Sequence, residues 1–325
     1  MKFVSVDLPY VGDKYLKQLR RIKGIEQVSV PVENPVSDQD IIDRIGNAEL
    51  ITSDITVQLT KKILKQVPNL KAIFCQAVGF DNIDVAYAKE QGIKVYNCAG
   101  FNATAVAEFA FALITSLFRK IPSAQAHVKA GGWLYRLFVG KELAGRTIGI
   151  VGSGNIALKI AAIATGYRMK VLSYTAHPSQ AKANLMHVDE FISLEKLLAR
   201  SHIIVLAVPL SLQTKHLIGK DELALMRKDA ILVNTARHTV VDEMALADAV
   251  LEGKIAGAVL DMMFKEPFNV KDYPMKIQEL VRLPNVIVTP HIAGVSEESA
   301  EFLGKIFVQN VKNFLQGDKT NCVNW

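Results

Sequence analysis

Short apolar runs alternate with helix-like stretches along almost the whole chain of 325 residues. In residues 1–100, each apolar run is followed by a turn and then by a segment with helical spacing, as at 13–22 and 60–66. The runs predict strands at Phe3–Val6, Leu50–Thr52, Ala72–Phe74 and Lys94–Tyr96. This alternation is typical of α/β proteins with parallel sheets.

A second series of strands follows a predicted helix that begins at Asn102, a favourable N-cap. Its apolar face comprises Val106, Phe109, Ala110, Leu113, Ile114 and Leu117, and we expect this helix to connect two domains. The second series predicts strands at Thr147–Val151, Lys170–Tyr174, Ile203–Ala207, Ala230–Asn234, Gly257–Leu260 and Val286–Val288. A final helix over 297–315 lies beyond the last strand, so we expect it to pack on the first domain.

Composition agrees with an ordinary globular protein, because half of the residues are hydrophobic and 22% are charged. A chain of this length favours two domains. The net charge is +6, but the basic residues are scattered, so we expect no nucleic-acid partner. The longest apolar stretch, 109–118, is too short to cross a bilayer, so we expect no membrane association.

The cysteines, Cys75, Cys98 and Cys322, lie far apart and show no disulfide or metal-ligand spacing. Reduced thiols are usual in the cytosol, and the chain begins with a strand pattern instead of a secretory segment. We therefore expect a cytoplasmic protein without a metal site, with Cys75 and Cys98 buried.

A glycine-rich turn follows the predicted strand at 147–151 and opens a helix: Gly152-Ser153-Gly154-Asn155-Ile156-Ala157. In this context the pattern predicts dinucleotide binding. Gly152 permits the tight turn, Gly154 lets the backbone approach a pyrophosphate, and Ala157 is small enough for helix–strand packing. N–H groups of Asn155 and Ile156 would face the phosphates. A ligand-free glycine turn or a methyl-donor site are the alternatives.

The next strand ends at Thr175, where NAD-binding proteins commonly have an acidic residue that binds the ribose. A carboxylate would repel a 2′-phosphate, so its absence favours NADP or dual use, although no arginine is present to bind the phosphate. His177 and Lys182 could supply positive charge nearby.

Three polar residues follow later strand-like runs in the order Arg237, Glu266, His291. Functional residues gather at the carboxyl ends of strands in open parallel sheets, so these side chains could converge. The arginine could bind a carboxylate, the histidine could exchange a proton, and the glutamate could raise the histidine pKa. Each residue alone could equally be structural.

With these residues the chain resembles the D-isomer-specific 2-hydroxyacid dehydrogenases over essentially its whole length. The matching segments are Gly79-Phe80-Asp81-Asn82-Ile83-Asp84, Asn102 to Glu108, Asn234-Thr235-Ala236-Arg237, Asp261 with Glu266-Pro267, and Thr289-Pro290-His291. Ala105, Thr175, His238 and Met262-Met263 depart from the family pattern. His238 replaces a usual glycine and would be strained if its φ were positive.

The resemblance implies a Rossmann-type NAD(P)-binding domain, residues 101–291, inserted in a split flavodoxin-like substrate domain, residues 1–100 plus 292–325. It also implies a homodimer. By the family's motifs, His291 is the acid/base, Glu266 its partner and Arg237 the substrate clamp, while Val78 and Gly79 bind the substrate carboxylate. The cofactor would be lined by Asn155, Ile156, Thr175, Val208, Pro209, Thr214, Thr235, Ala236 and Asp261.

We therefore expect hydride transfer between NAD(P)H and a small 2-keto acid such as glyoxylate, hydroxypyruvate or pyruvate. D-3-phosphoglycerate dehydrogenase is the second hypothesis within the class. An NAD(H)-sensing corepressor-like protein is the alternative from another class, and a Rossmann-type methyltransferase would leave the arginine–glutamate–histidine order unexplained. The sequence does not select among the 2-hydroxy acids.

Overall fold

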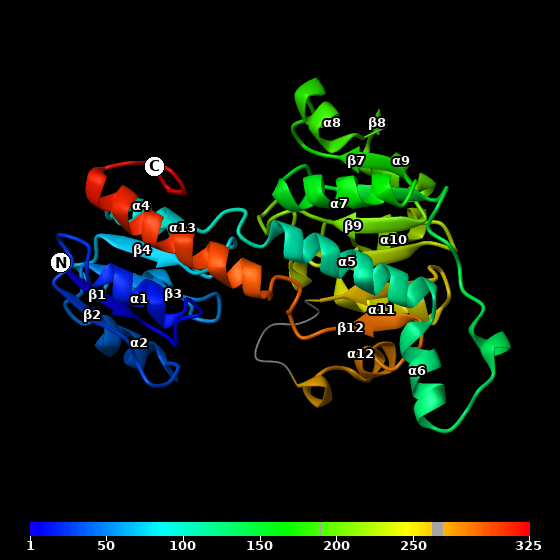
Figure 1. Ribbon diagram of the computed structural model, residues 1–325, viewed down its shortest axis with the longest axis horizontal. Coiled ribbons are helices and arrows are strands. Elements are labelled where there is room, and N and C mark those ends of the chain that lie inside the picture. Colours follow the sequence, from blue (N-terminus) through cyan, green and yellow to red (C-terminus); the bar gives the residue numbers. More distant parts are fainter. Residues whose placement is uncertain (189, 262–268) are drawn as a thin grey trace. The chain divides into compact units, whose positions relative to one another are not determined.

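The chain divides into two compact units in the computed structural model, which describes residues 1–188, 190–261 and 269–325 (Figure 1). Unit 1 comprises Met1–Asn102 and Val295–Trp325, and unit 2 comprises Ala103–Gly294. Each is a parallel sheet with helices on both faces, so the predicted α/β fold class is confirmed. In the part of the chain that is described, no helix is both long and apolar enough to span a membrane.

The sheet of unit 1 has the order β2-β1-β3-β4-β5, and every pairing in it is parallel. Its strands are β1 (Lys2–Ser5), β2 (Gln27–Ser29), β3 (Leu50–Ser53), β4 (Ala72–Cys75) and β5 (Lys94–Tyr96). Four of them fall where apolar runs predicted strands. The edge strand β2 was not predicted, because it is short and partly exposed and therefore carries no apolar run.

Two hydrophobic clusters cover the two faces of this sheet. The helices are α1 (Asp13–Leu19), α2 (Asp38–Ile45), α3 (Lys61–Leu64), α4 (Val85–Glu90) and α13 (Glu297–Gln316). On one face, α2, α3 and α4 pack against alternate strand residues such as Ile51 and Ile73. On the other, α1 and α13 pack against Phe3 and Phe74. The final helix thus packs on the first domain, as expected.

The last residues of the chain lie along the edge strand β5. The backbone N–H of Val323 donates to the carbonyl of Val95 (2.8 Å). The buried amide side chain of Asn324 accepts from the N–H of Val95 (2.9 Å) and donates to the carbonyl of Ile93 (2.7 Å). These bonds satisfy backbone groups that a sheet edge otherwise leaves unpaired.

The sheet of unit 2 has the order β12-β11-β10-β9-β6-β7-β8, again with parallel pairings. Its strands are β6 (Thr147–Val151), β7 (Lys170–Tyr174), β8 (Glu190–Phe191), β9 (Ile203–Leu206), β10 (Ile231–Asn234), β11 (Gly257–Leu260) and β12 (Val286–Val288). Only β8 was not predicted, because two residues at an edge give no periodic signal.

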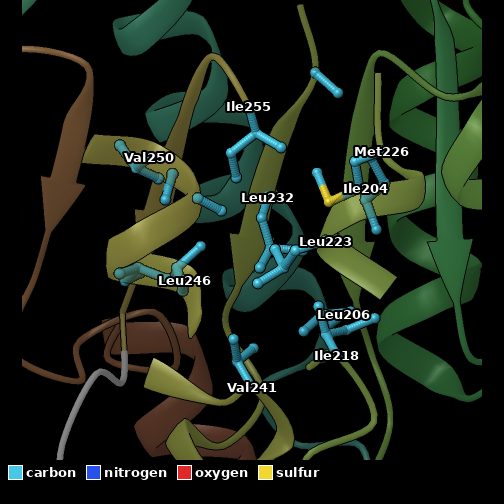
Figure 2. Close-up of a cluster of buried hydrophobic side chains, with 14 of the residues drawn as sticks. Ile204, Leu206, Ile218, Leu223, Met226, Leu232, Val241, Leu246, Val250 and Ile255 are labelled. Atoms are coloured by element: carbon cyan, nitrogen blue, oxygen red, sulfur yellow. The ribbon is translucent and has the colours of Figure 1, made fainter. Parts of the chain in front are cut away.

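Helices cover both faces of this sheet as well. They are α5 (Ala103–Phe118), α6 (Ile121–Lys129), α7 (Asn155–Gly166), α8 (Gln180–Met186), α9 (Leu194–Arg200), α10 (Lys220–Leu225), α11 (Glu243–Leu251) and α12 (Met275–Leu280), with 3-10 segments η1 (Tyr135–Phe138), η2 (His238–Val240) and η3 (Val270–Asp272). Figure 2 shows part of one core, where Leu223, Leu232 and Leu246 lie in the same cluster. The other core contains α5 and α7.

The buried face of α5 differs in part from the predicted one. Phe111, which the prediction omitted, is buried, whereas Phe109 is only partly buried. Phe111 stacks on the ring of Tyr167, with centroids 5.4 Å apart. Ala107 and Ala110 are fully buried, so the face that packs on α7 is lined by small residues and lies to one side of the predicted apolar stripe.

A glycine in α13 tests how tightly the final helix packs in unit 1. A Cβ at Gly304 would lie 2.1 Å from the ring of Tyr15 in α1. We expect Gly304→Ala to lower the free energy of unfolding by about 1–3 kcal/mol, because the aromatic ring must move in a packed core. Urea unfolding measures the change. Gly166→Ala is the control, since nothing lies within 4 Å of its added Cβ; equal effects of the two substitutions would contradict the packing argument.

Candidate active site

The glycine turn between β6 and α7 requires glycine at its first position. Gly152 has φ +122°, and a Cβ there would lie 2.3 Å from the carbonyl oxygen of Ala207. Its N–H donates to the carbonyl of Tyr174 (2.8 Å). The turn is therefore fixed against the ends of β7 and β9, the neighbours of β6 in the sheet.

The second glycine has a different role. Gly154 is the N-cap of α7, and a Cβ there would meet nothing within 4 Å. The protein itself does not require glycine at this position, whereas close approach of a ligand to the helix N-terminus would. Ala157 is fully buried, which agrees with the need for a small residue where the helix packs on the sheet.

The turn lies where the strand order of unit 2 reverses. β7 follows β6 on one side, and β9 pairs with β6 on the other. Ligands of open α/β sheets bind outside the carboxyl ends of the strands at this point. Val208 and Pro209 directly follow β9, and the loop beyond them is ordered by Thr214, whose hydroxyl donates to the carbonyl of Pro209 (2.6 Å).

Hydroxyl groups replace the usual carboxylate at the end of β7. The hydroxyls of Ser153 and Thr175 lie 2.9 Å apart, and the Thr175 oxygen accepts from the N–H of His177 (3.3 Å). The ammonium group of Lys182 donates to the carbonyl of His177 (2.9 Å). The exposed His177 and the partly buried Lys182 therefore lie together beside the end of β7.

The turn that carries Arg237 is held by a buried asparagine at the end of β10. The side chain of Asn234 accepts from the N–H of Ala236 (3.0 Å) and donates to the carbonyl of Arg237 (2.9 Å). Thr235, between them, has a buried hydroxyl oxygen without a hydrogen-bond partner among the described residues. Residues Asn234 to Arg237 thus form a compact turn at the carboxyl edge of the sheet.

His238 lacks the strain that a positive φ would impose. It begins the 3-10 segment η2, and its φ is not in the positive range. Its Nδ1 lies 3.1 Å from Oε1 of Glu243. The replacement of the family's usual glycine is therefore accommodated without backbone strain.

The turn that carries His291 is built around the buried carboxylate of Asp261, which is 1% exposed. The hydroxyl of Thr289 donates to Oδ1 (2.6 Å), as does the N–H of Ile292 (2.9 Å). The N–H of Ala293 donates to Oδ2 (2.8 Å), and the N–H of His291 donates to the Asp261 carbonyl (2.8 Å). Asp261, expected to line the cofactor, therefore also positions the histidine.

His291 itself has φ +55°. A left-handed backbone is uncommon for residues other than glycine, and such strain persists where the surroundings enforce it, often at functional sites. Here the bonds to the backbone of His291 and to its neighbours on both sides enforce it. The imidazole thus projects from a rigid turn.

Arg237 and His291 lie on turns at the same edge of one sheet. Arg237 follows β10 and His291 follows β12, with β11 between them. Two strand spacings separate the turns by about 10 Å, a distance that an extended arginine side chain largely spans. Glu266, the third predicted residue, lies outside the described residues, as do Pro267 and the Met262-Met263 departure.

The predicted carboxylate-binding residues Val78 and Gly79 belong to unit 1. They follow β4 and are partly exposed. The side chain of Asn97, after β5, donates to the carbonyl of Val78 (2.8 Å) and so fixes this loop.

Two residues that position these turns, Asn234 and Thr289, were not predicted from the sequence. Both belong to motif segments that were recognised, yet neither was given a role. The signal that could have indicated them is a polar residue at the end of a buried strand, next to a turn that carries a predicted site residue. Cys75 and Cys98 are buried as predicted, and burial raises the pKa of the Cys75 thiol to about 12.

Comparison with known proteins agrees with this geometry. Residues 111–293 match the NAD-binding domain of D-isomer-specific 2-hydroxyacid dehydrogenases. Glyoxylate reductase of Thermococcus litoralis is 34% identical over 330 residues, which cover 99% of this chain and 96% of the relative. D-3-phosphoglycerate dehydrogenase of Methanocaldococcus jannaschii is 36% identical over 305 residues, covering 93% of this chain but only 57% of that longer relative.

A solved structure is similar over nearly the whole length. It is an acyclic imino acid reductase in complex with NADPH and D-Arg, with a TM-score of 0.89 and 28% identity, covering 99% of this chain and 100% of that one.

The chain belongs to the D-isomer-specific 2-hydroxyacid dehydrogenase family. It is an oxidoreductase that uses NAD or NADP and acts on the CH–OH group of 2-hydroxy acids. The predicted family, cofactor class and enzyme class are thus confirmed.

The two glycines of the turn should respond differently to substitution. We expect Gly154→Ala to leave the thermal unfolding temperature within a few degrees of the wild type and to weaken NAD(P)H binding at least tenfold, because only the ligand needs the space. Gly152→Ala should lower the unfolding temperature, because its Cβ meets a backbone carbonyl. Calorimetry and nucleotide fluorescence titration measure both effects. Normal nucleotide affinity of Gly154→Ala would contradict the assignment.

Proposed function

We propose that the protein reduces small 2-oxo acids such as glyoxylate, hydroxypyruvate or pyruvate to D-2-hydroxy acids. Unit 2 would hold the nucleotide and unit 1 would contribute to substrate binding. The observation that carries the proposal is the pair of ordered turns that bring Arg237 and His291 to one sheet edge. The Thermococcus glyoxylate reductase, which aligns over 96% of its length, supports this substrate class.

Arg237 would bind the substrate carboxylate. A guanidinium group matches a carboxylate with two parallel hydrogen bonds, which fixes the orientation of the neighbouring carbonyl. The N–H groups of Val78 and Gly79 would hold the same carboxylate. Asn234 keeps the arginine turn rigid through bonds to its backbone, so little orientational freedom is lost on binding.

His291 would donate a proton to the carbonyl oxygen during reduction and accept it during oxidation. The bound nicotinamide supplies or accepts the hydride. Glu266 would favour the protonated imidazole, as a nearby carboxylate does. The bonds from Asp261 to the histidine turn hold the proton donor in place before the substrate arrives.

The residues of unit 2 fit a dinucleotide. Gly154 leaves room at the N-terminus of α7, and the buried, unpartnered hydroxyl of Thr235 among the described residues lies at the same sheet edge. Val208, Pro209, Thr214, Ala236 and Asp261 would complete the lining. Thr175, with His177 and Lys182 beside it, supports NADP use or dual use, because no carboxylate there repels a 2′-phosphate.

Phosphoglycerate oxidation is the second candidate, supported by the similarity to the Methanocaldococcus enzyme. A cofactor-sensing corepressor-like protein would use the same frame without turnover. Assays with phosphohydroxypyruvate beside hydroxypyruvate separate the first alternative from the proposal, and the absence of any turnover would favour the second.

A substrate screen with an active-site variant tests the proposal. We expect the wild type to oxidise NADPH or NADH with glyoxylate, hydroxypyruvate or pyruvate, and NADPH to support a rate at least equal to that with NADH. His291→Ala should lower kcat by about 10³-fold or more, because a positioned proton donor contributes that much, yet it should still bind nucleotide. Near-normal turnover of the variant would refute the role of His291.

We also propose that the protein is a cytoplasmic homodimer. Residues 121–139, which contain α6 and η1, extend from the body of unit 2 (Figure 1), and neither element has a buried residue. Trp133 is 88% exposed, Tyr135 79% and Val139 73%. A contiguous exposed apolar segment is unusual for a monomer and is typical of a protein interface. A second copy is the expected partner, since most oligomers are symmetric homo-oligomers.

Substitution in this segment tests the dimer. We expect Trp133→Glu to convert the protein from a dimer to a monomer in light scattering, because a charge cannot be buried there without a partner. Leu212→Glu is the control, since Leu212 is also highly exposed, at 93%, but lies outside residues 121–139. A monomeric wild type, or a Trp133→Glu dimer of unchanged affinity, would rule out this interface.

A further inference from the structure

The loop after β4 has two backbone N–H groups that bind nothing in the described part of the chain. Val78 and Gly79 follow β4 at the carboxyl edge of the sheet in unit 1, and both are partly buried. Neither N–H donates to a group in residues 1–188, 190–261 and 269–325. Backbone N–H groups away from water are nearly always paired, and the proposed function gives these two the substrate carboxylate as their partner.

The carbonyls of the same two peptide groups are bound from the segment after β5. The carbonyl of Ala77 accepts from the N–H of Cys98 (2.9 Å). The carbonyl of Val78 accepts from the side-chain amide of Asn97 (2.8 Å). β5 is the neighbour of β4 in the sheet, so both bonds come from the same side, and both carbonyls face the segment Asn97–Cys98.

These two bonds fix the direction of the unpaired N–H groups. In a trans peptide group the C=O and the N–H point in opposite directions. The N–H of Val78 shares its peptide group with the carbonyl of Ala77, and the N–H of Gly79 shares its own with the carbonyl of Val78. Both N–H groups therefore point away from the segment Asn97–Cys98. Successive N–H groups that point the same way form a concavity for an anion.

Asn97 is the side chain on which this arrangement depends. The bond from Cys98 comes from its backbone, so a change of side chain does not remove the donor, whereas the bond to Val78 requires the amide of Asn97. Asn97 is 7% exposed, and in such surroundings a hydrogen bond to a carbonyl also polarises the peptide group. Asn97 thus both orients the N–H of Gly79 and strengthens it as a donor.

The last helix and the segment after it hold Asn97 in place. The side-chain amide of Asn310 in α13 donates to the backbone carbonyl of Asn97 (2.8 Å), 213 positions away in the sequence. The Asn310 oxygen accepts from the side chain of Asn321 (2.9 Å). The N–H of Asn97 donates to the carbonyl of Asn321 (3.1 Å). Asn310 is 1% exposed, so these bonds are made in the interior of unit 1.

We propose that Asn97 is a positioning residue that aims the N–H of Gly79 at the substrate carboxylate, and that Asn310 holds Asn97 for this role. The inference deepens the proposed function and rests on it. Neither asparagine would touch the substrate, because their side-chain amides bind backbone carbonyls. Donors that are oriented before binding lose little freedom when the substrate arrives. The two residues therefore act on recognition of the carboxylate, and nucleotide binding in unit 2 does not depend on them.

A charged substrate and its neutral isostere test the proposal. The pair is whichever of glyoxylate, hydroxypyruvate and pyruvate turns over fastest, and its primary amide. The amide carries no charge and gains less from N–H groups arranged for a carboxylate. The measured quantity is the acid-to-amide ratio of kcat/KM. It does not depend on the fraction of folded enzyme, because both substrates meet the same sample.

We expect the wild type to prefer the acid and Asn97→Ala to lower the ratio about tenfold or more, since a small misplacement of a binding group is costly. The change should lie mainly in the KM of the acid, with NAD(P)H affinity in fluorescence titration unchanged. Asn310→Ala should lower the ratio in the same direction by a smaller factor. Asn313→Ala is the matched control: Asn313 is a buried asparagine of the same helix, and its side chain accepts from Gln309 (2.8 Å).

The outcomes distinguish the positioning role from the proposed function. Failure to reduce any 2-oxo acid would overturn both. Turnover of the acid with an unchanged ratio in Asn97→Ala, or in Asn310→Ala if the first variant does not fold, would overturn the positioning role alone. A wild-type ratio near one, or an equal fall in Asn313→Ala, would also overturn it. A fall in Asn97→Ala and Asn310→Ala that Asn313→Ala does not share supports it.

Discussion

The buried carboxylate of Asp261 is the interaction on which the arrangement of unit 2 depends. It accepts bonds from one hydroxyl and two backbone N–H groups of the turn after β12. These bonds compensate its burial and, at the same time, enforce the left-handed backbone of His291. Because a carboxylate can accept several hydrogen bonds at once, one side chain fixes the whole turn. The histidine is therefore positioned by the end of β11, independently of the substrate.

The two units are both parallel sheets with a reversal of strand order, but they differ in strand order and in electrostatics. In unit 2 the strand reversal carries a glycine turn and a helix N-terminus, which suit an anion. In unit 1 the reversal carries the carboxylates of Asp7, after β1, and Asp54, after β3. The net charge of +6 does not reveal this difference between the two sheet edges. It is a sum over the whole chain, in which the basic residues are scattered. A charge becomes informative only when the fold shows which sheet edge it occupies.

The sequence was sufficient to predict most of the fold because the central strands are continuous apolar runs. It failed at β2 and β8, which are short edge strands with exposed residues. It also placed Phe109 instead of Phe111 on the buried face of α5, since both rings satisfy a helical period and only the packing against α7 and Tyr167 distinguishes them. The strand-end positions of Arg237 and His291 were predicted from the apolar runs before them, and the structure places both on turns at one sheet edge. The positioning roles of Asn234 and Asp261 depend on turn geometry across neighbouring strands, so local sequence patterns do not predict them. The burial of Asp7 depends on loops that are distant in the sequence, so it could not be predicted either.

The lateral bonds of Val323 and Asn324 to β5 have a consequence for the order of folding. Unit 1 combines the start of the chain with its last residues, and α13 supplies much of one of its cores. During synthesis its first five strands must wait for the C-terminal segment, whereas unit 2 is continuous and can form as soon as it has left the ribosome. Chains released early would expose the apolar face that α13 covers, so quality control by chaperones should act chiefly on unit 1.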